Sequence, residues 1–169
     1  MPDSPVYAFA DRRDDSGRWP VADRSGAVVA RITHSFWTSR FAITDAAEQP
    51  LGEGSKQAFG AWVTVDPAGR ELMRVAGFSW TNKVGVQCRL GELTLRGRAF
   101  ARDWTVTDAG GGIVLSSVPE SGYFSFHPDS WVVTSDGRLD LAETVALVHM
   151  HRLAVKRQRS AGSASATST

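Results

Sequence analysis

The chain has 169 residues, of which 42% are hydrophobic and 22% charged, and its formal net charge is +1. This length fits one domain with a sizeable core, and the near-neutral charge argues against a nucleic-acid partner. The single cysteine, Cys88, excludes an internal disulfide and a thiolate metal cluster. A reducing cytosol is the simplest compartment for such a chain, so we expect a cytoplasmic protein.

The N-terminal segment is polar and contains the charged run from Asp11 to Gly17. We expect residues 1–17 to be a flexible segment that precedes the folded domain. The chain begins Met-Pro-Asp-Ser-Pro, without a basic start or a long apolar run, which does not fit a secretory signal peptide.

A repeated pattern begins after this segment: an aromatic residue, β-branched or apolar residues, an aspartate and then a small turn residue. The copies are Trp19–Gly26, Phe41–Glu48, Trp62–Gly69, Trp104–Gly111 and, more loosely, Trp131–Gly137. Aspartate bonds its own backbone in tight turns, so the pattern is typical of a strand that enters a hairpin turn. We therefore interpret the repeated aspartates as turn residues and not as acid–base catalysts. One hairpin per period predicts six hairpins and twelve strands.

The predicted strands alternate between two faces. In 83–89, Val84 and Val86 share one face with Cys88, whereas Lys83 and Arg89 share the other. The full set is 18–22, 27–33, 36–44, 50–57, 60–65, 70–78, 83–89, 92–99, 102–107, 112–118, 122–126 and 130–134.

A helix is predicted near the C-terminus, over about residues 139–157. Asp140 and Glu143 have the spacing of a capping box. Apolar side chains, among them Leu141, Val145 and Val148, point in almost every direction around the helix axis, which is typical of a buried helix. Charged residues and histidines interrupt the run, so it does not fit a membrane span. The remaining residues, 158–169, are basic and then rich in Ser and Ala, and we expect them to be disordered.

Strands and helix together predict a mainly β fold. Twelve antiparallel strands avoid exposed edges if they close into a barrel. Such a barrel is too wide for strand side chains alone to fill, and a helix that is apolar all round would occupy its interior. A WD-type propeller is the second possibility, because one spacing of 42 residues approaches the length of a blade. A hollow lipocalin-like barrel is the third.

The repeated hairpins and the Leu-Asp-x-Ala helix resemble the tubby C-terminal-like superfamily, within it the LURP-one-related and phospholipid-scramblase-like branch and its bacterial, single-domain members. The resemblance covers residues 18–157 and is carried best by Gly97–Val106 and Asp140–Val148. It implies a twelve-stranded barrel around a central helix. Tubby proteins bind phosphoinositide headgroups on the outer barrel surface, whereas most LURP-one-related proteins have no settled biochemistry. The chain lacks the scramblase cysteine cluster and an EF-hand calcium loop, which argues against scramblase activity.

No cofactor or metal site is predicted. His149 and His151 are two residues apart on the helix and face different ways, so they do not form a metal pair. Gly110–Gly112 is followed neither by the Lys and Ser or Thr of a phosphate loop nor by a helix. The chain contains no Gly-x-Ser-x-Gly nucleophile motif.

Basic residues gather on the outward face of the hairpin at 83–98, where a turn at Leu90–Gly91 would place Lys83 opposite Arg98. The predicted patch comprises Lys83, Arg89, Arg96, Arg98 and Arg102. Such a patch is either a solvated face or a site for anionic headgroups. We therefore expect a monomeric, non-catalytic binding or interaction module. Its partner is an unidentified protein or an anionic membrane surface, and the protein is cytoplasmic or peripheral to the membrane. An enzyme of unknown class is the remaining alternative.

Overall fold

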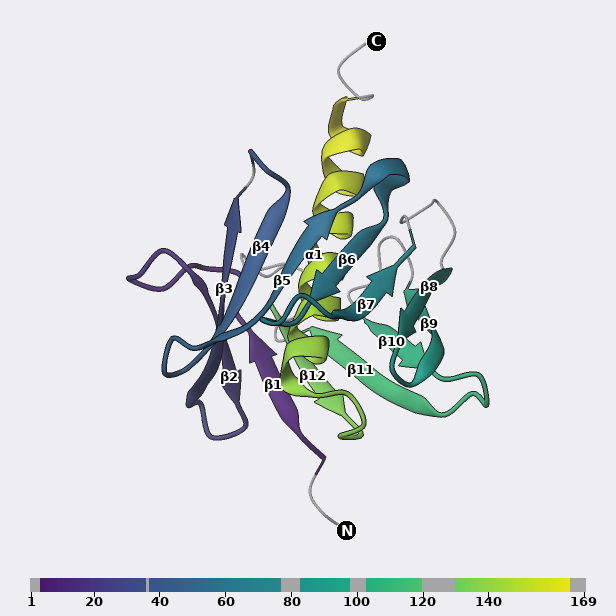
Figure 1. Cartoon of the computed structure of the whole chain (residues 1–169), viewed down its shortest axis with the longest axis horizontal. Helices are drawn as coiled ribbons and strands as arrows, with labels where there is room; N and C mark the ends of the chain where they lie inside the picture. Colours follow the sequence, from purple (N-terminus) through teal and green to yellow (C-terminus); the bar gives the residue numbers. More distant parts are fainter. Residues whose placement is uncertain (1–3, 36, 77–82, 98–102, 120–129, 165–169) are drawn as a thin grey trace.

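The computed structural model describes residues 4–35, 37–76, 83–97, 103–119 and 130–164. Within them, twelve antiparallel strands follow one another around a closed barrel, and a single helix runs through it (Figure 1). The strands are β1 (Val6–Phe9), β2 (Trp19–Asp23), β3 (Val28–Ser35), β4 (Arg40–Asp45), β5 (Pro50–Lys56), β6 (Trp62–Val65), β7 (Glu71–Val75), β8 (Lys83–Cys88), β9 (Gly91–Gly97), β10 (Trp104–Thr107), β11 (Ile113–Pro119) and β12 (Trp131–Ser135). A 3-10 turn, η1 (Ala58–Gly60), joins β5 to β6, and the helix is α1 (Leu141–Ala164).

The predicted mainly β barrel around a C-terminal helix is confirmed. One strand differs from the prediction: β1 lies in the segment that we expected to be flexible. It pairs with both β2 and β12 and thereby closes the barrel. The strand predicted at 122–126 lies outside the described residues. The helix also runs beyond the predicted residue 157, to Ala164.

The inner face of the barrel is lined by apolar side chains at alternate strand positions, such as Val21, Ile32 and Ile43, all fully buried. One glycine is required by this packing. A Cβ built on Gly54 would lie 2.0 Å from Cζ of Phe41, whose ring therefore lies across the backbone of β5. Only glycine allows this close approach of ring and strand.

The helix is buried on every side over residues 142–154. Val145, Leu147 and Val148 have no exposed surface. The predicted capping box is confirmed: the N–H of Glu143 donates to Oδ1 of Asp140 at 2.8 Å, and the N–H of Asp140 donates to Oε2 of Glu143 at 2.9 Å. The helix is not apolar throughout, however, because Glu143, His149 and Arg152 are also buried.

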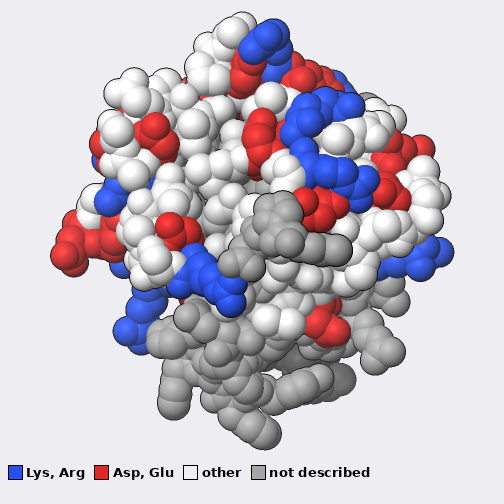
Figure 2. Space-filling view, turned by 90° about the horizontal axis from the view of Figure 1, so that it is seen from below, with Lys and Arg blue, Asp and Glu red and all other residues white. Residues whose placement is uncertain are grey.

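The repeated aspartates are turn residues, as predicted. Oδ1 of Asp66 accepts the N–H groups of Ala68 and Arg70 at 2.9 and 2.8 Å, and Gly69 has a left-handed φ of 80°. Equivalent turns begin at Asp14, Asp23, Asp45 and Asp108. The turns that follow β2, β4, β6 and β10 lie at the end of the barrel where α1 begins (Figure 1). Figure 2 views the molecule from this end and shows basic and acidic residues interspersed over it.

One copy of the turn departs from the others. Glu48 has a φ of 64° at the position where Gly17, Gly26, Gly69 and Gly111 stand in the other copies. A non-glycine residue in this region is strained. Its carboxylate binds two arginines: Oε1 lies 3.2 Å from Nη1 of Arg31, and Oε2 pairs with Nη1 of Arg18.

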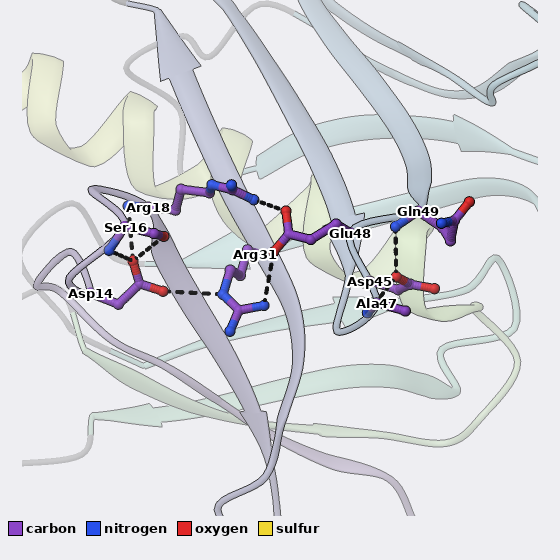
Figure 3. A network of polar contacts seen from close by, with 8 residues as sticks. All are labelled: Asp14, Ser16, Arg18, Arg31, Asp45, Ala47, Glu48 and Gln49. Atoms are coloured by element: carbon purple, nitrogen blue, oxygen red, sulfur yellow. Dashed lines mark hydrogen bonds and ion pairs between the residues drawn. The ribbon is translucent and has the colours of Figure 1, made fainter.

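Arg31 extends this network to a second turn, because its Nε lies 3.1 Å from Oδ2 of Asp14 (Figure 3). The network therefore links the β1–β2 connection, β3 and the β4–β5 turn. We expect electrostatic attraction within it to offset the backbone strain at Glu48.

We expect the effect of Glu48→Gly on stability to depend on these arginines. Glycine relieves strain of about 1 kcal/mol, but exposed ion pairs worth up to about 1 kcal/mol each are lost. The substitution should be close to neutral in the wild-type chain and stabilising by about 1 kcal/mol in an Arg18→Gln, Arg31→Gln background. Denaturant unfolding of the four proteins measures the difference. Equal effects in both backgrounds would show that the network does not offset the strain.

Candidate functional site: an outer cleft and a polar barrel interior

Two of the predicted patch residues lie side by side on the outer surface. Lys83 on β8 pairs directly with Arg96 on β9, and both are exposed. The predicted register, with Lys83 opposite Arg98, is wrong by two residues because the turn comprises Arg89 and Leu90. A shift of two residues keeps each side chain on its original face, so the predicted face is correct. Arg98 and Arg102 lie outside the described residues.

A surface cleft of about 500 Å³ lies beside these two cations. It is formed by β8, β9, β10 and β11 near the end of the barrel where α1 leaves. Asp103 contributes one negative charge to the lining, and Val118 contributes an apolar side chain that is 58% exposed. The complete lining is Lys83, Arg96, Gly97, Asp103, Trp104, Thr105, Ser117 and Val118. This volume suits a small ligand or a headgroup.

Arg89 lies apart from the other described residues of the predicted patch. It occupies the turn at the opposite end of the β8–β9 hairpin, where its Nε donates to Oε2 of Glu143 at 3.1 Å. Its Nη2 also donates to the carbonyl of Arg138, just before α1. Glu143 has no exposed surface, so Arg89 supplies the cation for a carboxylate buried at the start of the helix.

Arg89→Ala should destabilise the protein by about 1.5–3 kcal/mol, because it removes charge-assisted hydrogen bonds from a buried carboxylate. Glu143→Gln keeps the cap and removes the charge, so the cost of Arg89→Ala should become much smaller in that background. A double-mutant cycle from denaturant unfolding measures this coupling. If the two substitutions are additive, the ion pair does not hold the helix start.

Aromatic rings surround the two histidines of the helix inside the barrel. His149 contacts Phe41, His34 and Trp19, with ring centroids 4.9, 5.4 and 6.1 Å away. The ring of His151 lies 5.2 and 5.5 Å from the rings of Trp104 and Trp131. The prediction that the two histidines face different ways is confirmed.

The interior environment keeps these histidines neutral. Burial lowers the pKa of His149 well below its ordinary value, and the nearby positive charges of Arg152 and Lys156 and the His34 ring lower it further. Burial also lowers the pKa of His151 to about 4. Arg152 itself is 2% exposed, and its guanidinium lies 5.7 Å from the centroid of Trp131.

The fold should therefore lose stability as the pH falls below 6.5, the ordinary histidine value. Below that pH the unfolded chain binds protons that the folded chain does not. The free energy of unfolding therefore falls by about 1.4 kcal/mol per pH unit for each buried histidine. His151→Gln should flatten the dependence of unfolding free energy on pH between 6.5 and 5. An unchanged slope in that variant would show that His151 titrates normally in the folded protein.

Sequence reasoning did not foresee the approach of His34 to His149, because these residues come from β3 and α1, far apart in the chain.

In the part of the chain that the structure describes, no three His, Cys, Asp or Glu side chains are grouped to hold a metal ion. The same residues include no helix with the length and apolar character needed to cross a bilayer.

Comparisons with known proteins bear on the family and the fold of the chain. The family model described as LURP-one-related matches residues 13–151. The X-ray structure of a protein from Arabidopsis thaliana is similar in fold, with a TM-score of 0.66 and 14% sequence identity. The alignment covers 90% of this chain and 93% of the plant protein. None of the curated proteins compared by sequence matches the chain.

Proposed function

The chain belongs to the LURP-one-related family, and we propose that it is a non-catalytic binding module that recognises an anionic group on its outer surface. Family membership supports a non-enzymatic role. The packed interior also supports an outer site, because α1 fills the volume that a hollow barrel would offer to a ligand. In this proposal the protein acts as a monomer in the cytoplasm, at the periphery of a membrane.

The observation that carries the proposal is the pair of cations beside the cleft. Lys83 and Arg96 face the same outer surface from neighbouring strands and line one concave site. Both are suited to phosphate oxygens, and the guanidinium of Arg96 can donate two parallel hydrogen bonds. Asp103 adds one negative charge to the same lining and so reduces its net positive charge. We therefore expect modest, reversible binding that weakens as the salt concentration increases.

The polar groups of the cleft favour binding over catalysis. Oγ of Ser117 accepts the backbone N–H of Trp104 at 3.2 Å, so this hydroxyl is used within the sheet. Among the described lining residues there is no histidine to act as its base. A site of this composition can hold an anion between cations and an apolar wall.

The proposal is tested with dihexanoyl phosphatidylserine, a soluble lipid that presents the headgroup without a bilayer. Lys83→Gln with Arg96→Gln should abolish binding in a calorimetric or NMR titration at low salt, because both cations of the described cleft are lost. The matched control is Arg70→Gln with Arg74→Gln, which removes the same charge from exposed arginines that pair with Asp66 and Glu71.

The control variant should bind as the wild type does, and both variants should melt close to the wild type. No binding by the wild-type protein, or equal binding by the cleft variant, would contradict the proposal.

A further inference from the structure

A tryptophan at the tip of the β3–β4 hairpin is exposed. Trp37 is 99% exposed, whereas the other described tryptophans are 7% exposed or less. Those buried tryptophans are Trp19, Trp62, Trp104 and Trp131. Single exposed aliphatic side chains are common on protein surfaces, but the largest apolar side chain is a costly one to leave in water. The residues around Trp37 therefore indicate which partner its ring can contact.

The backbone holds Trp37 at the tip. Ser39, two residues later, has a left-handed φ of 50° without being glycine. The carbonyl of Ser39 accepts the N–H of Lys56 at 3.1 Å, and Arg40 pairs with Ser55. The tip is thus tied to β5 and projects from the end of the barrel where α1 leaves (Figure 1).

Two basic residues flank the tip. Arg40 and Lys56 are exposed beside it. The sequence contains no Asp or Glu from Thr33 to Ala42 or from Gly54 to Val65. The opposite end of the barrel differs, because aspartate turns and arginines alternate there (Figure 2). The described residues that flank the tip in β4 and β5 are therefore basic, and they accompany an exposed indole.

The cleft proposed above lies at this same end. Successive strands alternate in direction around the barrel, so the start of β8 and the end of β9 lie at the end that carries the β3–β4 tip. Lys83 and Arg96 are found there. The tip and the cleft therefore share one end of the barrel, at different points of its circumference.

We propose that the β3–β4 tip is an interfacial membrane anchor, in which Trp37 inserts among the headgroups of an anionic bilayer while Arg40 and Lys56 bind lipid phosphates. Tryptophan favours the boundary between headgroups and acyl chains, where its ring is buried and its N–H remains hydrogen-bonded. Basic residues beside it are attracted by anionic lipid.

A protein partner fits the observations less well. An aromatic residue that dominates a protein interface stands at the centre of a ring of further contacts. Trp37 stands on a projecting tip, and the other large apolar side chains that are exposed among the described residues, Ile113 and Val118, belong to β11. The inference rests on the proposed function, which supplies the anionic group. It deepens that function by assigning the anionic group to the lipids of a bilayer.

The test uses the full chain with vesicles of phosphatidylcholine alone or mixed with phosphatidylserine. Trp37→Ala should weaken sedimentation with the mixed vesicles by about tenfold or more, as expected for losing the burial of a large apolar side chain. The matched control, Ile113→Ala, removes a half-exposed apolar side chain at the opposite end and should leave binding unchanged. Arg40→Gln with Lys56→Gln should weaken binding at low salt only.

Fluorescence reports the insertion directly. Mixed vesicles should shift the wild-type emission to shorter wavelength, and brominated lipids should quench it; Trp37→Phe should abolish both changes. Wild-type vesicle binding that Trp37→Ala leaves intact, or an emission that vesicles do not alter, would overturn the inference. Capture of a protein through Trp37 without vesicle binding would overturn it in favour of a protein-docking tip.

The two proposals fail separately. If dihexanoyl phosphatidylserine binds in the cleft while vesicles leave the Trp37 emission unchanged, the anchor is overturned and the cleft remains. If dihexanoyl phosphatidylserine does not bind while mixed vesicles still shift the Trp37 emission, the cleft is overturned and the anchor remains.

Discussion

The interior width of a twelve-stranded barrel is the constraint on which the rest of this structure depends. Strand side chains reach only part of the way to the barrel axis, so the volume must be filled or left open. Here α1 fills it, and residues 142–154 are buried on every side. Close packing of strands and helix supplies most of the core, and it leaves the outer face and the two rims as the surfaces on which a ligand can bind.

Filling the barrel with α1 also brings polar side chains into the interior. Glu143 enters the barrel as part of the helix cap, and Arg89 from the β8–β9 turn neutralises it. His149 and His151 are buried among aromatic rings, where burial favours their neutral forms. The negative charge of Glu143 is consequently compensated at the start of the helix, whereas pH sensitivity arises further along it, at the two histidines.

Much of the architecture was predictable because local chemistry repeats along the chain. Each Asp turn is specified within five residues, and the inward positions of β8 follow from alternation within one strand. β1 was missed because it is short, although Asp14–Gly17 carries the same turn signal as the later copies. The β8–β9 register was wrong because moving a two-residue turn by one position changes every pair without changing the faces.

The candidate site was less predictable, because its parts come from distant segments. Lys83 and Arg96 belong to one hairpin and could be placed together, but Val118 reaches the cleft from β11. No local pattern connects Arg89 with Glu143 or His34 with His149, since each contact exists only once the helix is inside the barrel. The exposure of Trp37 likewise depends on the turn geometry of a single hairpin tip.

The central claim is that the helix is the core of the barrel, and Val145→Asp tests it most directly. Val145 has no exposed surface, so an unpaired carboxylate there should cost several kcal/mol, comparable with the whole stability of a domain. Val118→Asp, at a position that is 58% exposed, is the matched control. The account predicts that thermal or denaturant unfolding will find Val145→Asp unfolded or insoluble and Val118→Asp close to the wild type. A soluble Val145→Asp protein with a wild-type melting temperature would contradict it.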